Sequence, residues 1–212
     1  MRKFYFAIMT ACAVGSGGAQ ADSLYAGVDG GLANLDADWN LGSCCPPSSG
    51  NASDTGALGG IHGGFTHSDG QLMLGVETDL SFTNASEGFD GFEGIGVDLN
   101  FLASLRGRLG WNINDITPYI TAGVALGDFD YSQQGTFYPG TIDKVHDTQF
   151  GVVGGGGVEM AFAEGWTGRA EFLYYDFGKA SGQFASSFPY NYDVDSNVTV
   201  VRVGLSYDLA HW

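Results

Sequence analysis

The chain has 212 residues, of which 35 are glycine, and a formal net charge of −16. Its charged fraction of 15% is too low for a disordered acidic tail. The excess of acidic over basic residues also argues against binding to nucleic acid, because contacts with phosphates rest on Lys and Arg.

The first segment is typical of a secretory signal peptide. A positively charged start is followed by a short apolar run over residues 4–14 and by small residues that end at Ala21. The apolar run is shorter than the about 20 residues that a membrane-spanning helix requires. This order predicts a signal peptide over residues 1–21, cleaved before Asp22, and one mature domain over residues 22–212. The mature domain would keep six basic residues against 24 acidic ones, a formal charge of −18.

The cysteines leave two alternatives open. The residues that end at Cys12 weakly resemble a lipoprotein cleavage box, which would anchor the chain through Cys12, although Ala21 ends a better cleavage site. Cys44 and Cys45 are adjacent, and they form either a vicinal disulfide or two free thiols.

The rest of the chain alternates apolar and polar residues with a period of two, which predicts β-strands. In the clearest case Leu99 and Phe101 begin an apolar face that ends at Trp111, whereas Asn100 and Arg106 lie on the polar face. Each segment is near the about 9–11 residues that a tilted membrane strand needs. Eight strands are predicted, over residues 24–32, 56–66, 72–82, 99–111, 118–126, 149–162, 169–175 and 201–209.

The connections between these strands alternate in length. The long links cover residues 34–55, 83–98, 128–146 and 178–196, and the short ones cover residues 67–70, 112–116 and 163–165. Short turns at one rim and long loops at the other are typical of outer-membrane barrels, in which the long loops lie outside the cell. The sequence therefore predicts four acidic, surface-exposed loops.

The position of the arginines separates a membrane barrel from a soluble one. All four arginines of the mature domain lie in the middle of predicted strands, on the polar faces, and both lysines lie in the long links. An arginine on the lipid face near the membrane centre costs about 2–4 kcal/mol, and the sequence avoids that cost. We therefore predict an all-β, eight-stranded, antiparallel up-and-down transmembrane β-barrel with a polar interior.

The polar faces carry acidic residues as well, so the interior is expected to hold an ion-pair network and to leave little open lumen, because an eight-stranded barrel is just wide enough for side chains to fill. Tyr25, Trp111, Tyr119, Trp166 and Tyr174 fall near strand ends, where aromatic girdles belong. The predicted network consists of Arg106, Arg108, Arg169, Arg202, Asp29, Glu77, Asp79, Glu159, Glu171 and Asp208.

Five stretches of the chain carry a family resemblance: residues 24–27 (LYAG), 118–125 (PYITAGVA), 154–159 (GGGGVE), 169–178 (RAEFLYYDFG) and 201–207 (VRVGLSY). In this order they resemble the opacity/OmpA-like outer-membrane β-barrel family, especially the porin-like surface proteins of alphaproteobacteria. The resemblance implies a location in the outer membrane of a Gram-negative bacterium. It also implies contact with outer-membrane lipid and lipopolysaccharide, and with the barrel-assembly machinery.

Members of that family end on an aromatic residue that the assembly machinery reads. Here the matching C-terminal segment contains Tyr207 and has Leu209 at its last place, and Trp212 follows three residues later, out of the two-residue alternation. The residue that is read is therefore either Leu209 or Trp212.

No motif in the chain predicts catalysis, a cofactor or a metal ion. The glycine run over residues 154–157 lacks the Lys-Ser/Thr of a phosphate loop. The acidic spacing that begins at Asp36 has its glycine one place late for a calcium loop, and no two histidines have metal-ligand spacing. A membrane hydrolase would need a serine, a histidine and a carboxylate within mutual reach, and no motif singles out such a set.

Two functions follow from these observations. The favoured one is a structural and surface-interaction role, in which the barrel anchors loops that contact a host or neighbouring-cell ligand. The alternative is a narrow porin that passes small solutes or ions, since interior glycines could leave a channel.

Overall fold

The computed structural model describes residues 20–42, 48–87, 95–134, 142–184 and 190–211. No helix in these ranges is long and apolar enough to cross a bilayer. The strands are β1 (Gln20–Gly42), β2 (Ser48–Asp69), β3 (Leu72–Thr83), β4 (Ser86–Glu87), β5 (Ile95–Trp111), β6 (Ile116–Gln134), β7 (Ile142–Ala163), β8 (Trp166–Phe184) and β9 (Tyr190–His211).

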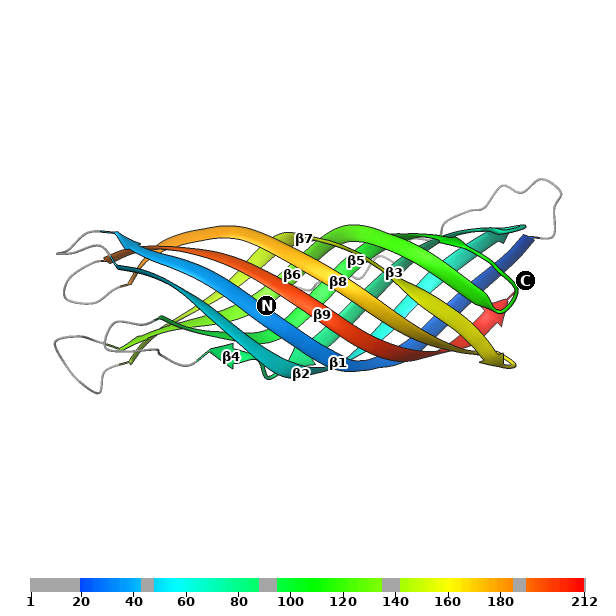
Figure 1. Ribbon diagram of the computed structural model, residues 1–212, viewed down its shortest axis with the longest axis horizontal. Coiled ribbons are helices and arrows are strands. Elements are labelled where there is room, and N and C mark those ends of the chain that lie inside the picture. Colours follow the sequence, from blue (N-terminus) through cyan, green and yellow to red (C-terminus); the bar gives the residue numbers. More distant parts are fainter. Residues whose placement is uncertain (1–19, 43–47, 88–94, 135–141, 185–189, 212) are drawn as a thin grey trace, which may run out of the picture.

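The sheet closes on itself as a barrel whose strands run obliquely to its long axis (Figure 1). Every strand pairs antiparallel with its neighbours, and the first and last strands, β1 and β9, pair to close the ring. The two-residue β4 continues the line of β3 along β5, so β3 and β4 together form one barrel strand. The predicted fold class, an eight-stranded antiparallel up-and-down barrel, is confirmed.

The two ends of the barrel differ in their connections. Tight turns join β2 to β3, β5 to β6 and β7 to β8 at one end, where β1 begins and β9 ends. In outer-membrane barrels the end with the short turns faces the periplasm. The connections at the other end, the extracellular end, cover residues 43–47, 88–94, 135–141 and 185–189.

The strands are longer than predicted. The sequence suggested about 9–11 residues for each, but β1 has 23 residues and β9 has 22. Most of the four long links that were predicted as loops are therefore strand, and the expectation of long extracellular loops is wrong in extent. Most of the extra length lies at the extracellular end of the barrel.

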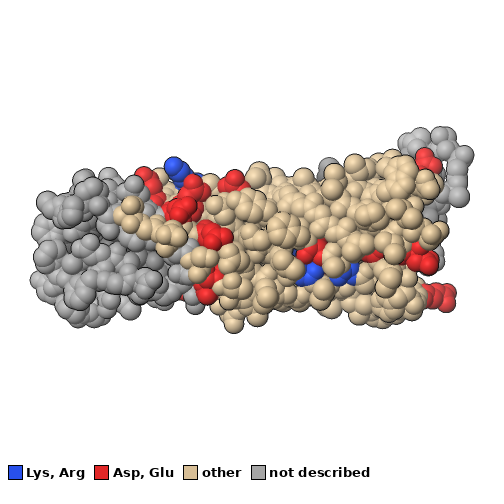
Figure 2. Space-filling view, viewed as in Figure 1, with Lys and Arg blue, Asp and Glu red and all other residues tan. Residues whose placement is uncertain are grey.

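The membrane part of the barrel turns apolar side chains outward. On β1, Leu24, Val28 and Leu32 are exposed, whereas Tyr25 and Asp29 between them are buried in the interior. The middle of the barrel surface accordingly carries few charges (Figure 2). We call this surface the lipid-facing band; it includes Leu24, Val28, Leu32, Ile61, Leu74, Val76, Phe82, Leu105, Leu109, Ile120, Val124, Phe150, Val152, Phe172, Val201, Val203 and Leu205.

Beyond the lipid-facing band the same strands continue with the opposite polarity. On β9, Val194 and Val198 are completely buried inside the barrel, and Asp195 and Asn197 lie on the outer face. The backbone alternation is unbroken, but the apolar face moves from the outside to the inside of the barrel at residues 200–201. The extracellular end is therefore built like a soluble barrel, with an apolar interior and a polar surface.

Aspartates dominate the outer face of this extension. They come from five strands of the barrel and lie just beyond the lipid-facing band, where acidic residues gather next to the extracellular end (Figure 2). We call them the acidic collar: Asp36, Asp38, Asp98, Asp128, Asp130, Asp176, Asp193 and Asp195.

A β-bulge reverses two predicted orientations on β5. The register of β5 against β6 shifts between Leu99 and Phe101. Leu99 is only 2% exposed and belongs to the interior, and Asn100 is exposed. The sequence alternation had placed Leu99 outside and Asn100 inside. A bulge adds one residue to the strand and so changes which side chains face inward, but the apolar/polar order of the sequence gives no sign of it.

Candidate functional site in the barrel interior

The interior of the membrane part holds the four arginines on three strands. Arg106 and Arg108 come from β5, Arg169 from β8 and Arg202 from β9, and each is less than 5% exposed. Strand register sets acidic residues opposite them. Glu77 of β3 pairs with Arg106, Glu159 of β7 with Arg169, and Glu171 of β8 with Arg202.

Arg106 lies at the centre of the network. Its Nη2 donates to Glu77 Oε1 at 2.5 Å and to Asp79 Oδ1 at 2.7 Å, and its Nη1 donates to Glu171 Oε1 at 2.8 Å. All four side chains have no exposed surface. One guanidinium thus joins carboxylates from opposite walls of the barrel.

Arg169 and Arg202 extend the network to the closing strand pair. Arg169 Nη1 donates to Glu77 Oε2 at 2.5 Å and its Nη2 donates to Asp29 Oδ1 at 2.9 Å. Arg202 donates from Nε to Glu171 Oε2 at 2.7 Å, and its Nη1 lies 3.6 Å from Asp29 Oδ2. Asp29 belongs to β1 and Arg202 to β9, so the network spans the seam at which the barrel closes.

Arg108 lies nearest to the periplasmic end and is held by acids and rings. Its Nη2 donates to Glu159 Oε1 at 2.6 Å, and its Nη1 donates to Tyr25 Oη at 2.7 Å. Its guanidinium carbon lies 4.0 Å from the centroid of the Tyr119 ring, a cation–π contact. The prediction that Tyr25 and Tyr119 belong to an aromatic girdle is therefore wrong, whereas Trp111, Trp166 and Tyr174 do face outward.

Nine of the ten residues predicted for the network lie together, and Asp208 does not. Asp208 accepts a hydrogen bond from Ser23 Oγ at 2.7 Å near the periplasmic end, and no arginine of the described ranges pairs with it. The network therefore sets four guanidiniums against five carboxylates, and of these nine side chains only that of Glu159, 14% exposed, has more than about one per cent of its surface accessible. Its members are Arg106, Arg108, Arg169, Arg202, Asp29, Glu77, Asp79, Glu159 and Glu171.

A serine, a histidine and a carboxylate meet beside this network, although no sequence motif pointed to them. His62 Nδ1 lies 2.8 Å from Asp29 Oδ2, and His62 Nε2 lies 2.7 Å from Ser206 Oγ. Strand register brings them together, since His62 and Ser206 both pair with Gly27 of β1. A Cβ at Gly27 would collide with the His62 ring, so the absent side chain opens the space in which the contact forms. The alternation within each strand does not determine the register between strands, so it could not indicate that these three residues meet.

The geometry of this set resembles a hydrolase triad, but its surroundings differ from one. Asp29 Oδ1 also accepts two hydrogen bonds from Arg169, which compete with the histidine for the carboxylate charge. Ser206 is 4% exposed and lies on β9, which is paired on both sides, so the nearby backbone N–H groups are committed to the sheet. An oxyanion needs donors that are free to point at it.

The remaining predicted residues lie at the periplasmic end. Tyr207 and Leu209 are on the outer face of β9, 44% and 60% exposed, and Trp212 lies outside the described residues. Residues 20–21 are the first two of β1, so the predicted cleavage before Asp22 falls inside that strand. Within the ranges that the structure covers, no three His, Cys, Asp or Glu side chains are arranged to hold a metal ion.

A closed eight-stranded barrel with an apolar outer band and buried interior charges is the architecture of a bacterial outer-membrane protein. The chain belongs to the family of the outer membrane protein beta-barrel domain, whose model matches residues 4–208. It is therefore an outer-membrane protein of this family, as the sequence resemblance predicted.

Curated relatives from alphaproteobacteria agree with this assignment. The chain is 28% identical over 136 residues to a 25 kDa outer-membrane immunogenic protein of Brucella abortus, covering 64% of this chain and 58% of that protein. It is 32% identical over 135 residues to a 22 kDa outer membrane protein of Rhizobium leguminosarum, covering 63% of this chain and 57% of that protein. The matches thus span less than two thirds of these relatives.

A solved structure agrees in fold. The outer membrane protein OprG from Pseudomonas aeruginosa has a TM-score of 0.55 and 17% identity, and the match covers 87% of this chain and 96% of OprG. At this identity the likeness shows the barrel fold and nothing of the activity.

Proposed function

We propose that this protein is a closed outer-membrane barrel with a structural and surface-interaction role. The observation that carries the proposal is the filled interior. Four guanidiniums and five carboxylates from six strands occupy the lumen of the membrane part, with almost no accessible side-chain surface. A water-filled pore needs a continuous wet path, and a lumen filled by mutually bonded side chains does not offer one.

The surface role rests on the extracellular extension. The strands of the barrel continue past the lipid-facing band into this extension. The acidic collar surrounds the base of this extension. We infer contacts of the barrel with outer-membrane lipid and lipopolysaccharide, delivery by the barrel-assembly machinery, and a host or neighbouring-cell ligand at the extracellular tips.

Catalysis is not part of the proposal, although Asp29, His62 and Ser206 form a hydrogen-bonded chain. The arginine contacts of Asp29 and the burial of Ser206 favour a packing role. The test is labelling of the folded protein with a fluorophosphonate probe, with Ser206→Ala as the matched control. We expect no labelling of either protein; labelling that Ser206→Ala abolishes would overturn the non-catalytic proposal.

Single-channel conductance of the refolded mature protein in a planar bilayer tests the closed barrel directly. We expect a silent membrane, with folding verified by a heat-modifiable shift in gel mobility. Steady, reproducible current steps from the folded protein would favour the alternative function, a narrow porin for small solutes or ions.

A further inference from the structure

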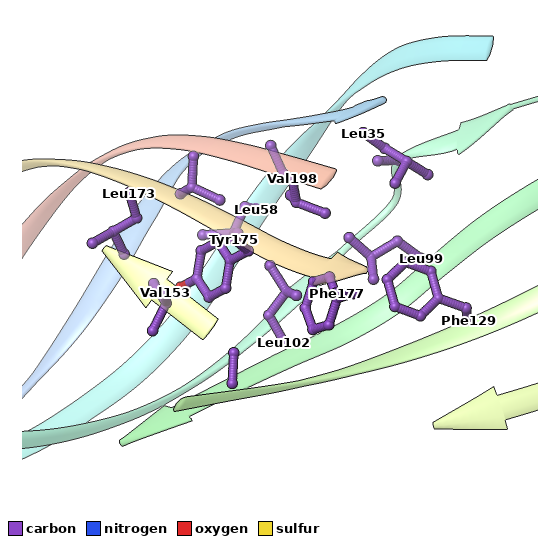
Figure 3. Close-up of a cluster of buried hydrophobic side chains, with 14 of the residues drawn as sticks. Leu35, Leu58, Leu99, Leu102, Phe129, Val153, Leu173, Tyr175, Phe177 and Val198 are labelled. Carbon is purple, nitrogen blue, oxygen red and sulfur yellow. The ribbon is translucent and has the colours of Figure 1, made fainter. Parts of the chain in front are cut away.

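A second layer of side chains fills the extracellular half of the interior, and it is apolar. Leu58, Leu102, Tyr175 and Val198 come from four different strands and lie together inside the barrel (Figure 3). We call this cluster the apolar layer; it consists of Ala33, Leu35, Ala37, Leu58, Ala85, Leu99, Leu102, Ala125, Phe129, Val153, Leu173, Tyr175, Phe177, Val194, Val198 and Val200.

The side chains of the apolar layer are as deeply buried as those of a soluble core. Phe129, Leu173 and Val198 are completely buried. The rings of Phe129 and Phe177 meet edge to face with centroids 5.1 Å apart, and Tyr175 stacks on Phe177 at 6.2 Å. Such ring arrangements are favourable beyond the area they bury.

The apolar layer and the ionic network follow each other along the same strands. On the inner face of β8, Arg169 and Glu171 are succeeded by Leu173, Tyr175 and Phe177 toward the extracellular end. The same order holds on two further strands, with Asp29 before Ala33 on β1 and Arg106 before Leu102 on β5. The two layers therefore lie in series along the lumen.

The two layers exclude ions by different physical means. The ionic network blocks the lumen with charged side chains that are bonded to one another. The apolar layer offers a permeating ion or water molecule few hydrogen-bonding groups beyond the buried side chains of Ser196 and Gln149 and the Tyr175 hydroxyl. Hydrophobic constrictions close by dewetting even where atoms leave some space. No member of the apolar layer forms an ion pair, so the two layers are held together by different interactions.

We propose that the apolar layer is a second, independent seal, so that the barrel is closed twice in series. The inference deepens the closed-barrel part of the proposed function. It predicts that disruption of the ionic network alone leaves the barrel closed to ions, and it assigns to Leu102, Phe129, Leu173 and Tyr175 the role of the hydrophobic barrier.

The test compares four proteins in planar bilayers. The ionic variant carries Arg106→Ser, Arg202→Ser, Asp79→Ser and Glu171→Ser, which removes equal numbers of cations and anions and keeps Arg108 with Glu159 and Arg169 with Asp29. The apolar variant carries Leu102→Ala, Phe129→Ala, Leu173→Ala and Tyr175→Ala. The third is the combined variant, and the fourth is the unaltered protein.

We expect current steps from the combined variant alone, with all four proteins folded by heat-modifiable mobility. If the eight-substitution protein does not fold, Leu102→Ala with Tyr175→Ala in the ionic variant replaces it. Steps from either single-layer variant would overturn closure by two independent layers and leave the closed barrel in place. Steps from the unaltered protein would overturn both, and a folded but silent combined variant would overturn the assignment of the two seals to the eight substituted side chains.

Discussion

Replacement of Arg106 by leucine is expected to destabilise the barrel more than any exposed charge change. Arg106 Nη1 and Nη2 donate to Glu77, Asp79 and Glu171, and none of these side chains has accessible surface. Removing one partner of a buried ion pair costs about 3–5 kcal/mol, because the other charge stays buried without compensation. Here the carboxylates keep Arg108, Arg169 and Arg202 as partners, which places the loss at the lower end, about 3 kcal/mol.

The assay is reversible unfolding of the mature protein by urea in lipid vesicles, followed by tryptophan fluorescence. Exposed Lys179→Leu is the control and should change the free energy of unfolding by about 0.5 kcal/mol or less. A double variant, Arg106→Leu with Asp79→Leu, should lose less than the sum of the single losses, by about 0.5–3 kcal/mol. A loss below about 1 kcal/mol for Arg106→Leu would refute the view that the network is a cooperative buried unit.

Three further predictions follow from other parts of the barrel. Gly27→Ala should cost about 1–3 kcal/mol in the same unfolding assay through overpacking against the backbone oxygen of Leu205 and the ring of His62, whereas Gly30→Ala on the lipid-facing side of the same strand meets nothing within 4 Å and should be neutral. His146 lies beyond the lipid-facing band, and the hydrogen bond to Asp130 at 2.8 Å, followed by the charge of Asp128 at 3.1 Å, raises its pKa. This contact should stabilise the folded state fully below the unfolded histidine pKa of about 6.5 and be lost as the pH rises through the folded value, which an NMR titration of His146 with His146→Gln as the control will check. Deletion of residues 210–212 should lower the yield of folded barrel in the outer membrane if Trp212 is the residue read for assembly, and Leu209→Phe in the deleted chain should restore that yield; an unchanged yield on deletion would assign the signal to Leu209.

Alternation and charge were enough to predict the barrel and most of its ionic interior. Arg106 and Arg169 sit in strands whose other faces are apolar, so membrane insertion leaves them only the inside. The same argument applies to the charged residues of each strand separately, and therefore the members of the ionic network could be predicted as a group. Which carboxylate meets which guanidinium depends on register between strands, and alternation within one strand carries no information on that.

The extracellular half of the barrel was not predicted as strand, because its apolar side chains face inward and its polar side chains face outward, the reverse of the membrane part. On β9 the apolar residues are Val201, Val203 and Leu205 on the outside, and then Val200 and Val198 on the inside. A search for period two sees the apolar positions slip by one residue and ends the strand there. The slip marks the membrane surface, where the outer solvent changes from lipid to water while the backbone continues.

Tyrosine was misplaced for a related reason. Tyr25 and Tyr119 occur near strand ends, as girdle residues do, but their hydroxyls bond to Glu77 and Glu171 in the interior. A tyrosine suits both places, since its ring is apolar and its hydroxyl forms hydrogen bonds. Only the pairing of the strands decides between them.

The interior ion pairs across the seam between β1 and β9 favour the correct strand register when the barrel closes during assembly. Closing the barrel requires these two strands to meet, and in the observed register Arg169 and Arg202 both reach Asp29. A slip of one residue would turn Arg202 toward the acyl chains, at about 2–4 kcal/mol, and would remove a partner from Asp29. An incorrectly joined barrel thus exposes the Arg202 charge to lipid and weakens the contacts of Asp29, whereas the observed register keeps both charges paired inside the barrel.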